Sequence, residues 1–340
     1  MKKAFLVKLG ILASLFILPE AEALGKGFSN PYEFTLDYSL TSEIPKNANL
    51  HVLIISSRDF NVEQGYTYER GVAKNGERQI FIVSRVIDST YVTVYPDILS
   101  ALSVFNDDKP FLIFVNGHGK NFEQAIARGF DLSDRYNLNM IMFDWPTEYF
   151  ALRKTAHNAR KVTKNFAITV TELDEAFSKL DLKSNKSVIF HSMGNLIARN
   201  IVRKDYLDSM PENIFQNIIL NAAAVNQRNH KEWVNQLDLQ DRIYIISNRD
   251  DLPLKGVKIL RLTTPLGSEI KDSFSDKAKY IDFSEIAGRE HNLFLGRTQV
   301  EKNHPNVYDF YFSLFNGQEV DLTNPDDFAE IPSGNRYKIL

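Results

Sequence analysis

The 340-residue sequence contains no cysteine. This absence excludes disulfide bonds, thiol nucleophiles, cysteine zinc ligands and an N-terminal lipid on cysteine. Long basic runs are also missing and the formal net charge is −3, so we expect no nucleic-acid partner. The seven histidines are scattered and none pairs with a carboxylate at ligand spacing. We therefore expect neither a metal site nor another cofactor.

The sequence also lacks an apolar run of the roughly 20 residues that a membrane-spanning helix needs. Its first residues instead have the pattern of an export signal. Met1-Lys2-Lys3 is basic, residues 4–18 are mostly apolar, and Ala21-Glu22-Ala23 has the small-x-small form of a cleavage site. We expect residues 1–23 to be a signal peptide cleaved after Ala23. The mature protein would be soluble, without a transmembrane span, and periplasmic or secreted.

The mature chain, residues 24–340, has the composition of a folded globular domain, with 44% apolar and 24% charged residues in the full sequence. Short apolar runs alternate with polar stretches of helical periodicity. Most of these runs are continuously apolar, as is typical of central strands that are covered on both faces. The predicted strands are 51–57, 80–87, 111–117, 138–145, 187–192, 215–223, 242–248 and 279–286.

The clearest helix is predicted from Thr155 to Leu180. Its apolar residues recur every three or four positions and form one core-facing stripe. Strands that alternate with helices predict an α/β fold with a mostly parallel sheet of about eight strands and helices on both faces. In such sheets the functional residues gather at the carboxyl ends of the strands. Residues 24–49 precede the first predicted strand and form an N-terminal arm that could be a strap, a lid or a partner-binding segment.

Ser192 lies where the apolar run "SVIFHS" changes to a helical pattern. A nucleophile elbow has the form G-x-S-x-G between a strand and a helix, and this sequence reads Phe190-His191-Ser192-Met193-Gly194. The second glycine is present, and Phe190 replaces the first. A serine that only caps a helix is the alternative interpretation. The strand before, the helix after and Gly194 favour a catalytic nucleophile.

A serine hydroxyl becomes an effective nucleophile only when a base takes its proton and a third group orients that base. In this type of fold the acid follows a late strand, and "RIYIISNRDDLPL" places Asp250 and Asp251 just after one. We predict Asp250 as the acid and keep Asp251 as its alternative. The alternative interpretation is that the aspartate is only a solvated carboxylate in a turn, beside Arg249.

The predicted base is His291, which follows the last strand after a loop containing Gly288. His304 is the competing candidate. The segment "NHPNVYDFYFSLFNG" reads as a helix with Pro305 at its first position and Gly317 at its end, so His304 is better explained as a cap residue.

An acyl-transfer site also needs donors for the developing oxyanion. The backbone N–H of Met193, next to the nucleophile, is one candidate. The other would come from the loop after "FLIFV", where Gly117 and Gly119 permit a sharp turn and His118 is a candidate donor. The glycines could instead serve only the turn. A phosphate loop is excluded because no G-K-[ST] follows at the required spacing.

These segments together resemble a bacterial alpha/beta-hydrolase family of unknown function, from about His51 to Gly317. The similar segments are the loop and Trp-Pro motif of residues 111–147, the elbow "HSMGN", the acid turn "SNRDDL", and "HNLFLG" with the closing helix. The resemblance implies an α/β-hydrolase fold with Ser192 as nucleophile, Asp250 as acid and His291 as base. Asn116, Gly119 with Lys120, and Phe190 depart from the family pattern.

The function predicted from these residues is an exported serine hydrolase, esterase- or lipase-like, that cleaves an ester-like bond of a small-molecule or lipid-like acyl substrate. The alternative is a non-catalytic α/β-hydrolase-fold protein used for binding or associated with the cell envelope. Fold alone does not establish activity, and the departures are expected of a site that no longer catalyses.

Overall fold

The structure is a computed structural model and describes residues 36–61, 67–147, 152–261, 263–271, 273–332 and 334–340. The expected signal peptide and residues 24–35 of the arm lie outside the described residues. Within the described part of the chain, no helix combines the length and the apolar character that crossing a bilayer would require.

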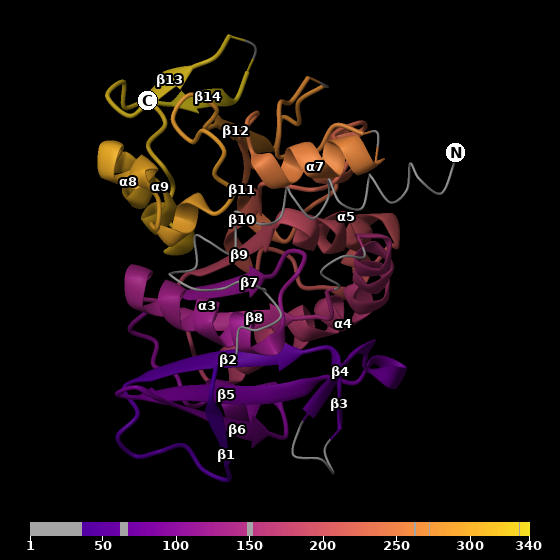
Figure 1. The fold of residues 1–340 in the computed structure, drawn as a ribbon, viewed down its shortest axis with the longest axis vertical. Coiled ribbons are helices and arrows are strands. Elements are labelled where there is room, and N and C mark those ends of the chain that lie inside the picture. Colours follow the sequence, from indigo (N-terminus) through magenta and orange to yellow (C-terminus); the bar gives the residue numbers. More distant parts are fainter. Residues whose placement is uncertain (1–35, 62–66, 148–151, 262, 272, 333) are drawn as a thin grey trace, which may run out of the picture.

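The main sheet has twelve strands in the order β1-β6-β5-β2-β8-β7-β9-β10-β11-β12-β14-β13 (Figure 1). Its neighbouring strands are parallel except at β2–β5, β5–β6 and β13–β14. A separate hairpin pairs β3 with β4. The strands are β1 (Tyr38–Thr41), β2 (Leu50–Ser56), β3 (Arg58–Asn61), β4 (Thr67–Val72), β5 (Gln79–Val86), β6 (Ser89–Tyr95), β7 (Phe111–Val115), β8 (Asn139–Asp144), β9 (Lys186–His191), β10 (Phe215–Asn221), β11 (Gln240–Ser247), β12 (Ala278–Asp282), β13 (Phe328–Glu330) and β14 (Arg336–Ile339).

The eight strands predicted from the sequence are the contiguous central part of this sheet, from β5 to β12. The prediction of about eight strands was too low, because β1 and β6 extend one edge and β14 and β13 extend the other. The four added strands are only partly buried, so they lack continuous apolar runs, which strands covered on both faces need. Part of the N-terminal arm is therefore β1, which pairs in parallel with β6.

Helices cover both faces of the sheet, as predicted (Figure 1). Helices α3 and α9 pack on one face, and α2, α4, α5, α6 and α7 pack on the other, so the apolar core forms two layers separated by the sheet. The helices are α2 (Ile98–Leu102), α3 (Phe122–Tyr136), α4 (Leu152–Lys179), α5 (Asn195–Arg203), α6 (His230–Val234), α7 (Leu252–Arg261), α8 (Gln299–Asn303) and α9 (Asn306–Phe315).

The connections place the segments that carry the candidate catalytic residues at the side of the sheet formed by the carboxyl ends of its strands. Ser192 follows β9, residues 222–227 follow β10, the two aspartates follow β11, and His291 follows β12. Because these four strands are parallel, their carboxyl ends lie at the same edge.

Candidate active site

Ser192 has the backbone conformation of a nucleophile elbow. Its φ is +52°, in the left-handed region that non-glycine residues rarely adopt. The strand β9 ends at His191, a short 3₁₀ turn covers Ser192–Gly194, and α5 begins at Asn195. A serine that merely capped a helix would keep an ordinary extended backbone, so this strained conformation favours the nucleophile interpretation.

Two glycines allow the elbow to pack closely against the end of β7. A Cβ on Gly194 would lie 2.7 Å from the carbonyl oxygen of Val115 and 2.8 Å from that of Asn116. A Cβ on Gly117 would lie 2.8 Å from the Cβ of Ser192. Any larger residue at either position would therefore push the β7 loop and the elbow apart.

Phe190, the departure from the family pattern, fits the core. Its ring is buried and packs edge-on against Phe166 of α4, with the ring centroids 5.3 Å apart. The long helix thus leaves room for the aromatic ring beneath the elbow.

Asn195 ties the elbow to its neighbours. Its buried Nδ2 donates to the carbonyl oxygens of Phe190 (2.6 Å), Ser192 (3.0 Å) and Asn221 (3.3 Å). The backbone N–H of Ala224 also donates to the carbonyl of Ser192, at 3.1 Å. These bonds fix the strained turn to the segment that follows β10.

His291 forms a short hydrogen bond with an aspartate. Its Nδ1 lies 2.6 Å from Oδ2 of Asp251, and the two residues are only 8% and 1% exposed. The other oxygen of Asp251, Oδ1, accepts the backbone N–H of Leu254 at 2.9 Å and so caps the first turn of α7. Asp251 is thereby held in place while it faces the imidazole.

The structure places Asp251 against His291, and not Asp250, the aspartate that the sequence favoured. The Asp250 carboxylate is 39% exposed and pairs with Lys255 Nζ at 2.8 Å and with Arg249 at 3.5 Å. The Lys255 hydrogen bond, followed by the charges of Lys255 and Arg249, lowers the pKa of Asp250 despite slight desolvation. Asp250 is therefore a solvated carboxylate in the turn, whereas Asp251 contacts His291.

The His291 ring contacts the ring of His191 at the elbow. The two imidazole centroids lie 4.7 Å apart, and His191 directly precedes Ser192. Hydrogen bonds between a serine nucleophile and its base are often loose before a substrate binds. His304, the competing base, instead faces the carbonyl oxygen of Leu340 with its Nδ1 at 3.3 Å.

A buried polar chain supports His191, and no pattern in the sequence indicates it. The hydroxyl of Tyr311 in α9 donates to Oδ1 of Asn221 (2.9 Å), and Nδ2 of Asn221 lies 3.0 Å from Nδ1 of His191. Because an amide nitrogen can only donate, Nδ1 of His191 is the acceptor and the ring is neutral. Burial, and then the charges of His291, Arg128 and Lys120, hold the pKa of His191 well below its usual range, against a smaller opposite effect of Asn292.

The loop after β7 is fixed from several sides. Trp145 Nε1 donates to the carbonyl oxygen of Asn116 at 2.9 Å, and Thr147 Oγ1 hydrogen-bonds both the N–H and the carbonyl of Lys120. Arg58 donates to the same Lys120 carbonyl at 2.8 Å. The loop is therefore a rigid element that faces the elbow.

Arg58 is itself held by a buried ion pair. Its Nε and Nη2 lie 2.7 and 2.9 Å from the two carboxylate oxygens of Asp144, which also accepts the hydroxyl of Ser56 at 2.6 Å. Both charged side chains are almost fully inaccessible to solvent. The hairpin strand β3 is thus tied, through Arg58, to the loop that faces Ser192.

The predicted oxyanion donors lie around this loop. Gly119 has φ +72°, and His118 Nδ1 lies 2.9 Å from Thr155 Oγ1 in α4, which fixes the imidazole. Met193 is buried in the turn after Ser192. Asn116 has a buried side-chain amide with no hydrogen-bond partner among the described residues.

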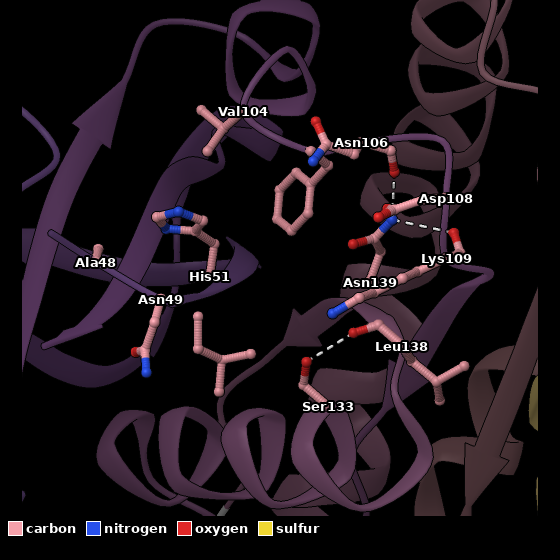
Figure 2. Close-up of a pocket in the computed structure, with 12 residues that line it drawn as sticks. Ala48, Asn49, His51, Val104, Asn106, Asp108, Lys109, Ser133, Leu138 and Asn139 are labelled. Atoms are coloured by element: carbon pink, nitrogen blue, oxygen red, sulfur yellow. Dashed lines mark hydrogen bonds between the residues drawn. The ribbon is translucent and has the colours of Figure 1, made fainter. Parts of the chain in front are cut away.

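A cavity of about 250 Å³ lies at the other side of the sheet, where the amino ends of the strands lie (Figure 2). Its lining comes from the amino ends of β2, β7 and β8, and includes His51, Asp108 and Lys109. His51 contacts Ser84, and burial lowers the pKa of His51. This cavity is separated from Ser192 by the length of the strands. Among the described residues, no group of three or more histidine or acidic side chains could hold a metal ion.

Two of the solved structures that match this chain are hydrolases by name. The esterase from the hyperthermophilic archaeon Pyrobaculum calidifontis has 12% identity and a TM-score of 0.39, over 71% of this chain and 82% of that one. A protein of Agrobacterium vitis S4 named "Putative hydrolase" has 14% identity and a TM-score of 0.32, over 71% of this chain and 96% of that one. No curated protein matches the chain.

A family model does match the chain over most of its length. The family is described as "Alpha/beta hydrolase of unknown function (DUF900)", and the match covers residues 98–308. That segment contains the β7 loop, the Ser192 elbow, Asp251 and His291, and the strand order around it is consistent with an α/β-hydrolase fold. The chain therefore belongs to the DUF900 family of alpha/beta hydrolases.

Proposed function

We propose that this protein is a serine hydrolase that cleaves an ester-like acyl bond through Ser192, His291 and Asp251. The observation that carries the proposal is the buried hydrogen bond of 2.6 Å between His291 and Asp251. The imidazole of His291 also packs against His191, which directly precedes Ser192, the serine with φ +52°. A base oriented by a carboxylate beside a strained serine is the arrangement that activates a hydroxyl.

In the proposed reaction, Ser192 Oγ attacks the acyl carbon while Nε2 of His291 takes the hydroxyl proton. Asp251 accepts the Nδ1–H and stabilises the imidazolium that forms. The tetrahedral oxyanion is bound by the N–H of Met193 and by donors of the loop at Gly117–Gly119, including His118. When the intermediate collapses, His291 gives the proton to the leaving oxygen. Water, deprotonated by the same imidazole, then hydrolyses the acyl-enzyme.

The first test is hydrolysis of short p-nitrophenyl esters by the purified protein. Replacing Ser192 with alanine should lower kcat by about 10⁶-fold while the far-UV circular dichroism stays unchanged. His291→Ala should have a comparable effect. His304→Ala is the matched control, since it removes a histidine whose Nδ1 faces the Leu340 carbonyl instead of Asp251, and it should keep wild-type activity.

Covalent labelling separates catalysis from binding. A fluorophosphonate probe should modify the wild-type protein at Ser192 and leave Ser192→Ala unlabelled. If the folded wild-type protein hydrolyses no ester and stays unlabelled, the non-catalytic binding role becomes the better description.

The pattern of residues 1–23 supports a further part of the proposal, that the hydrolase is exported to the periplasm or medium with cleavage after Ala23. Fractionation of expressing cells and N-terminal sequencing of the mature chain test it. A protein retained in the cytoplasm with Met1 intact would contradict it.

A further inference from the structure

A cavity of about 790 Å³ lies on the α4–α5 face of the sheet, near the carboxyl ends of its strands. Its walls come from the first turns of α4, from α5, from the segment after β10, and from the end of α7 with the residues that follow it. Figure 1 shows α4, α5 and α7 along this one side of the molecule. The volume is within the range of about 300–1,000 Å³ that small-molecule sites occupy.

The charged side chains that line this cavity from the described part of the chain are all basic. Arg153, His157 and Arg160 line it from α4, Arg199 lines it from α5, and no aspartate or glutamate among the described residues contributes to it. Spacings of four and three residues place the three α4 side chains on the same face of the helix. Within the described residues, Arg153 and Arg160 form no ion pair. Arginine side chains keep their positive charge at physiological pH, so the cavity favours an anion.

The lining of the cavity connects to the elbow through single residues. Ala224 is part of its lining, and the N–H of Ala224 donates to the Ser192 carbonyl at 3.1 Å. Ala156, also in the lining, follows Thr155, which holds His118. The lining of this cavity therefore includes a residue bonded to the nucleophile turn and a neighbour of the residue that holds His118.

The wall from α7, the residues that follow it and the segment after β10 is mostly apolar, with Val225, Val257, Leu260 and Pro265. An apolar wall facing a basic one suits a short hydrocarbon segment that carries an anionic group. We propose that this cavity binds the anionic end of the substrate, so that the preferred substrate is an ester with a carboxylate or phosphate a few carbons from the scissile bond. This inference rests on the proposed hydrolase function.

The test compares two p-nitrophenyl esters of equal chain length, the neutral butyrate and the anionic monoester of succinate. Wild-type protein should have the higher kcat/KM for the succinate ester, and the preference should fall as NaCl is raised. Arg153→Gln and Arg160→Gln should each lower kcat/KM for the succinate ester by about tenfold and leave the butyrate unchanged. Lys161→Gln removes a neighbouring charge that does not line the cavity, and should change neither value.

Competition experiments distinguish the two sources of charge. Glutarate and propyl phosphate are compared as inhibitors with neutral glutaramide. Stronger inhibition by glutarate assigns the cavity to carboxylates, and stronger inhibition by propyl phosphate assigns it to phosphates. Equal, weak inhibition by all three overturns the inference.

Failure of this inference is distinguishable from failure of the proposed function. If the butyrate is hydrolysed but the succinate ester is not preferred and the arginine variants change nothing, the anion site is refuted and the hydrolase remains. If no ester is hydrolysed, calorimetric titration of the Ser192→Ala protein with monobutyl glutarate tests the cavity alone. Binding that Arg160→Gln weakens about tenfold supports the site, and absence of binding refutes it.

Discussion

Replacing each of the two adjacent aspartates with asparagine should separate their roles sharply. Asp251→Asn is expected to lower kcat toward a short ester by about 10⁴-fold, because the amide can no longer stabilise the imidazolium or hold the productive tautomer of His291. A factor of 10⁴ corresponds to about 5.5 kcal/mol of transition-state stabilisation. The structural basis is the hydrogen bond of 2.6 Å between two residues that are nearly inaccessible to solvent.

Asp250→Asn is the matched control, since it makes the same chemical change one residue away. Its carboxylate is 39% exposed and pairs with Lys255 and Arg249 at the surface. Exposed pairs of this kind contribute about 0–1 kcal/mol to stability, so the variant should keep wild-type kcat and lose little stability.

The assay is steady-state hydrolysis of p-nitrophenyl butyrate by both variants, with thermal unfolding to verify folding. Asp251→Asn should stay folded because an asparagine can still accept the N–H of Leu254 at the start of α7. The reasoning is refuted if Asp250→Asn is the more damaged enzyme. It is also refuted if Asp251→Asn loses less than about tenfold while Ser192→Ala is inactive.

Three further predictions concern the support of the elbow. Gly194→Ala should lower the free energy of unfolding by about 1–3 kcal/mol in chemical denaturation, because its Cβ would lie 2.7 Å from the Val115 carbonyl oxygen; an unchanged midpoint would contradict this. Arg58→Met should lower the free energy of unfolding by about 3–5 kcal/mol, because it leaves the Asp144 carboxylate buried without its cation. The double variant Arg58→Met, Asp144→Leu should recover part of that lost stability. The lowered pKa of His191 means that the unfolded chain binds its proton more readily than the folded protein does. Stability should therefore fall as pH decreases below about 6.5, by up to about 1.4 kcal/mol per pH unit from this residue, and His191→Gln should have the shallower dependence; equal slopes would refute it.

The central fold could be predicted because its signals are local. Buried parallel strands require continuous apolar runs, and all eight such runs became neighbouring strands. The outer strands β1, β6, β14 and β13 were missed because they carry no such runs. β6 follows β5 after a turn in which Ile87 is 82% exposed and has φ +54°, a use of isoleucine that no propensity favours.

The choice between Asp250 and Asp251 could not be made from position alone. Both residues follow β11, and at the start of a helix neighbouring side chains point about 100° apart. The deciding feature is the cap of α7, because the residue whose oxygen accepts the N–H of Leu254 is oriented toward the interior, where His291 lies. Pro253 in the first turn is the one local signal that could have favoured a helix start at this point.

His191 shows what a sequence pattern leaves out altogether. Its partners, Asn221 at the end of β10 and Tyr311 in α9, are distant in sequence and meet only when the sheet and its covering helix assemble. Their hydrogen bonds keep the ring neutral although it lies 4.7 Å from His291. In the proposed reaction His291 becomes an imidazolium, and a second positive charge at that distance would oppose it. The buried chain from Tyr311 to His191 therefore confines the transient positive charge to the one imidazole that has Asp251 as its partner.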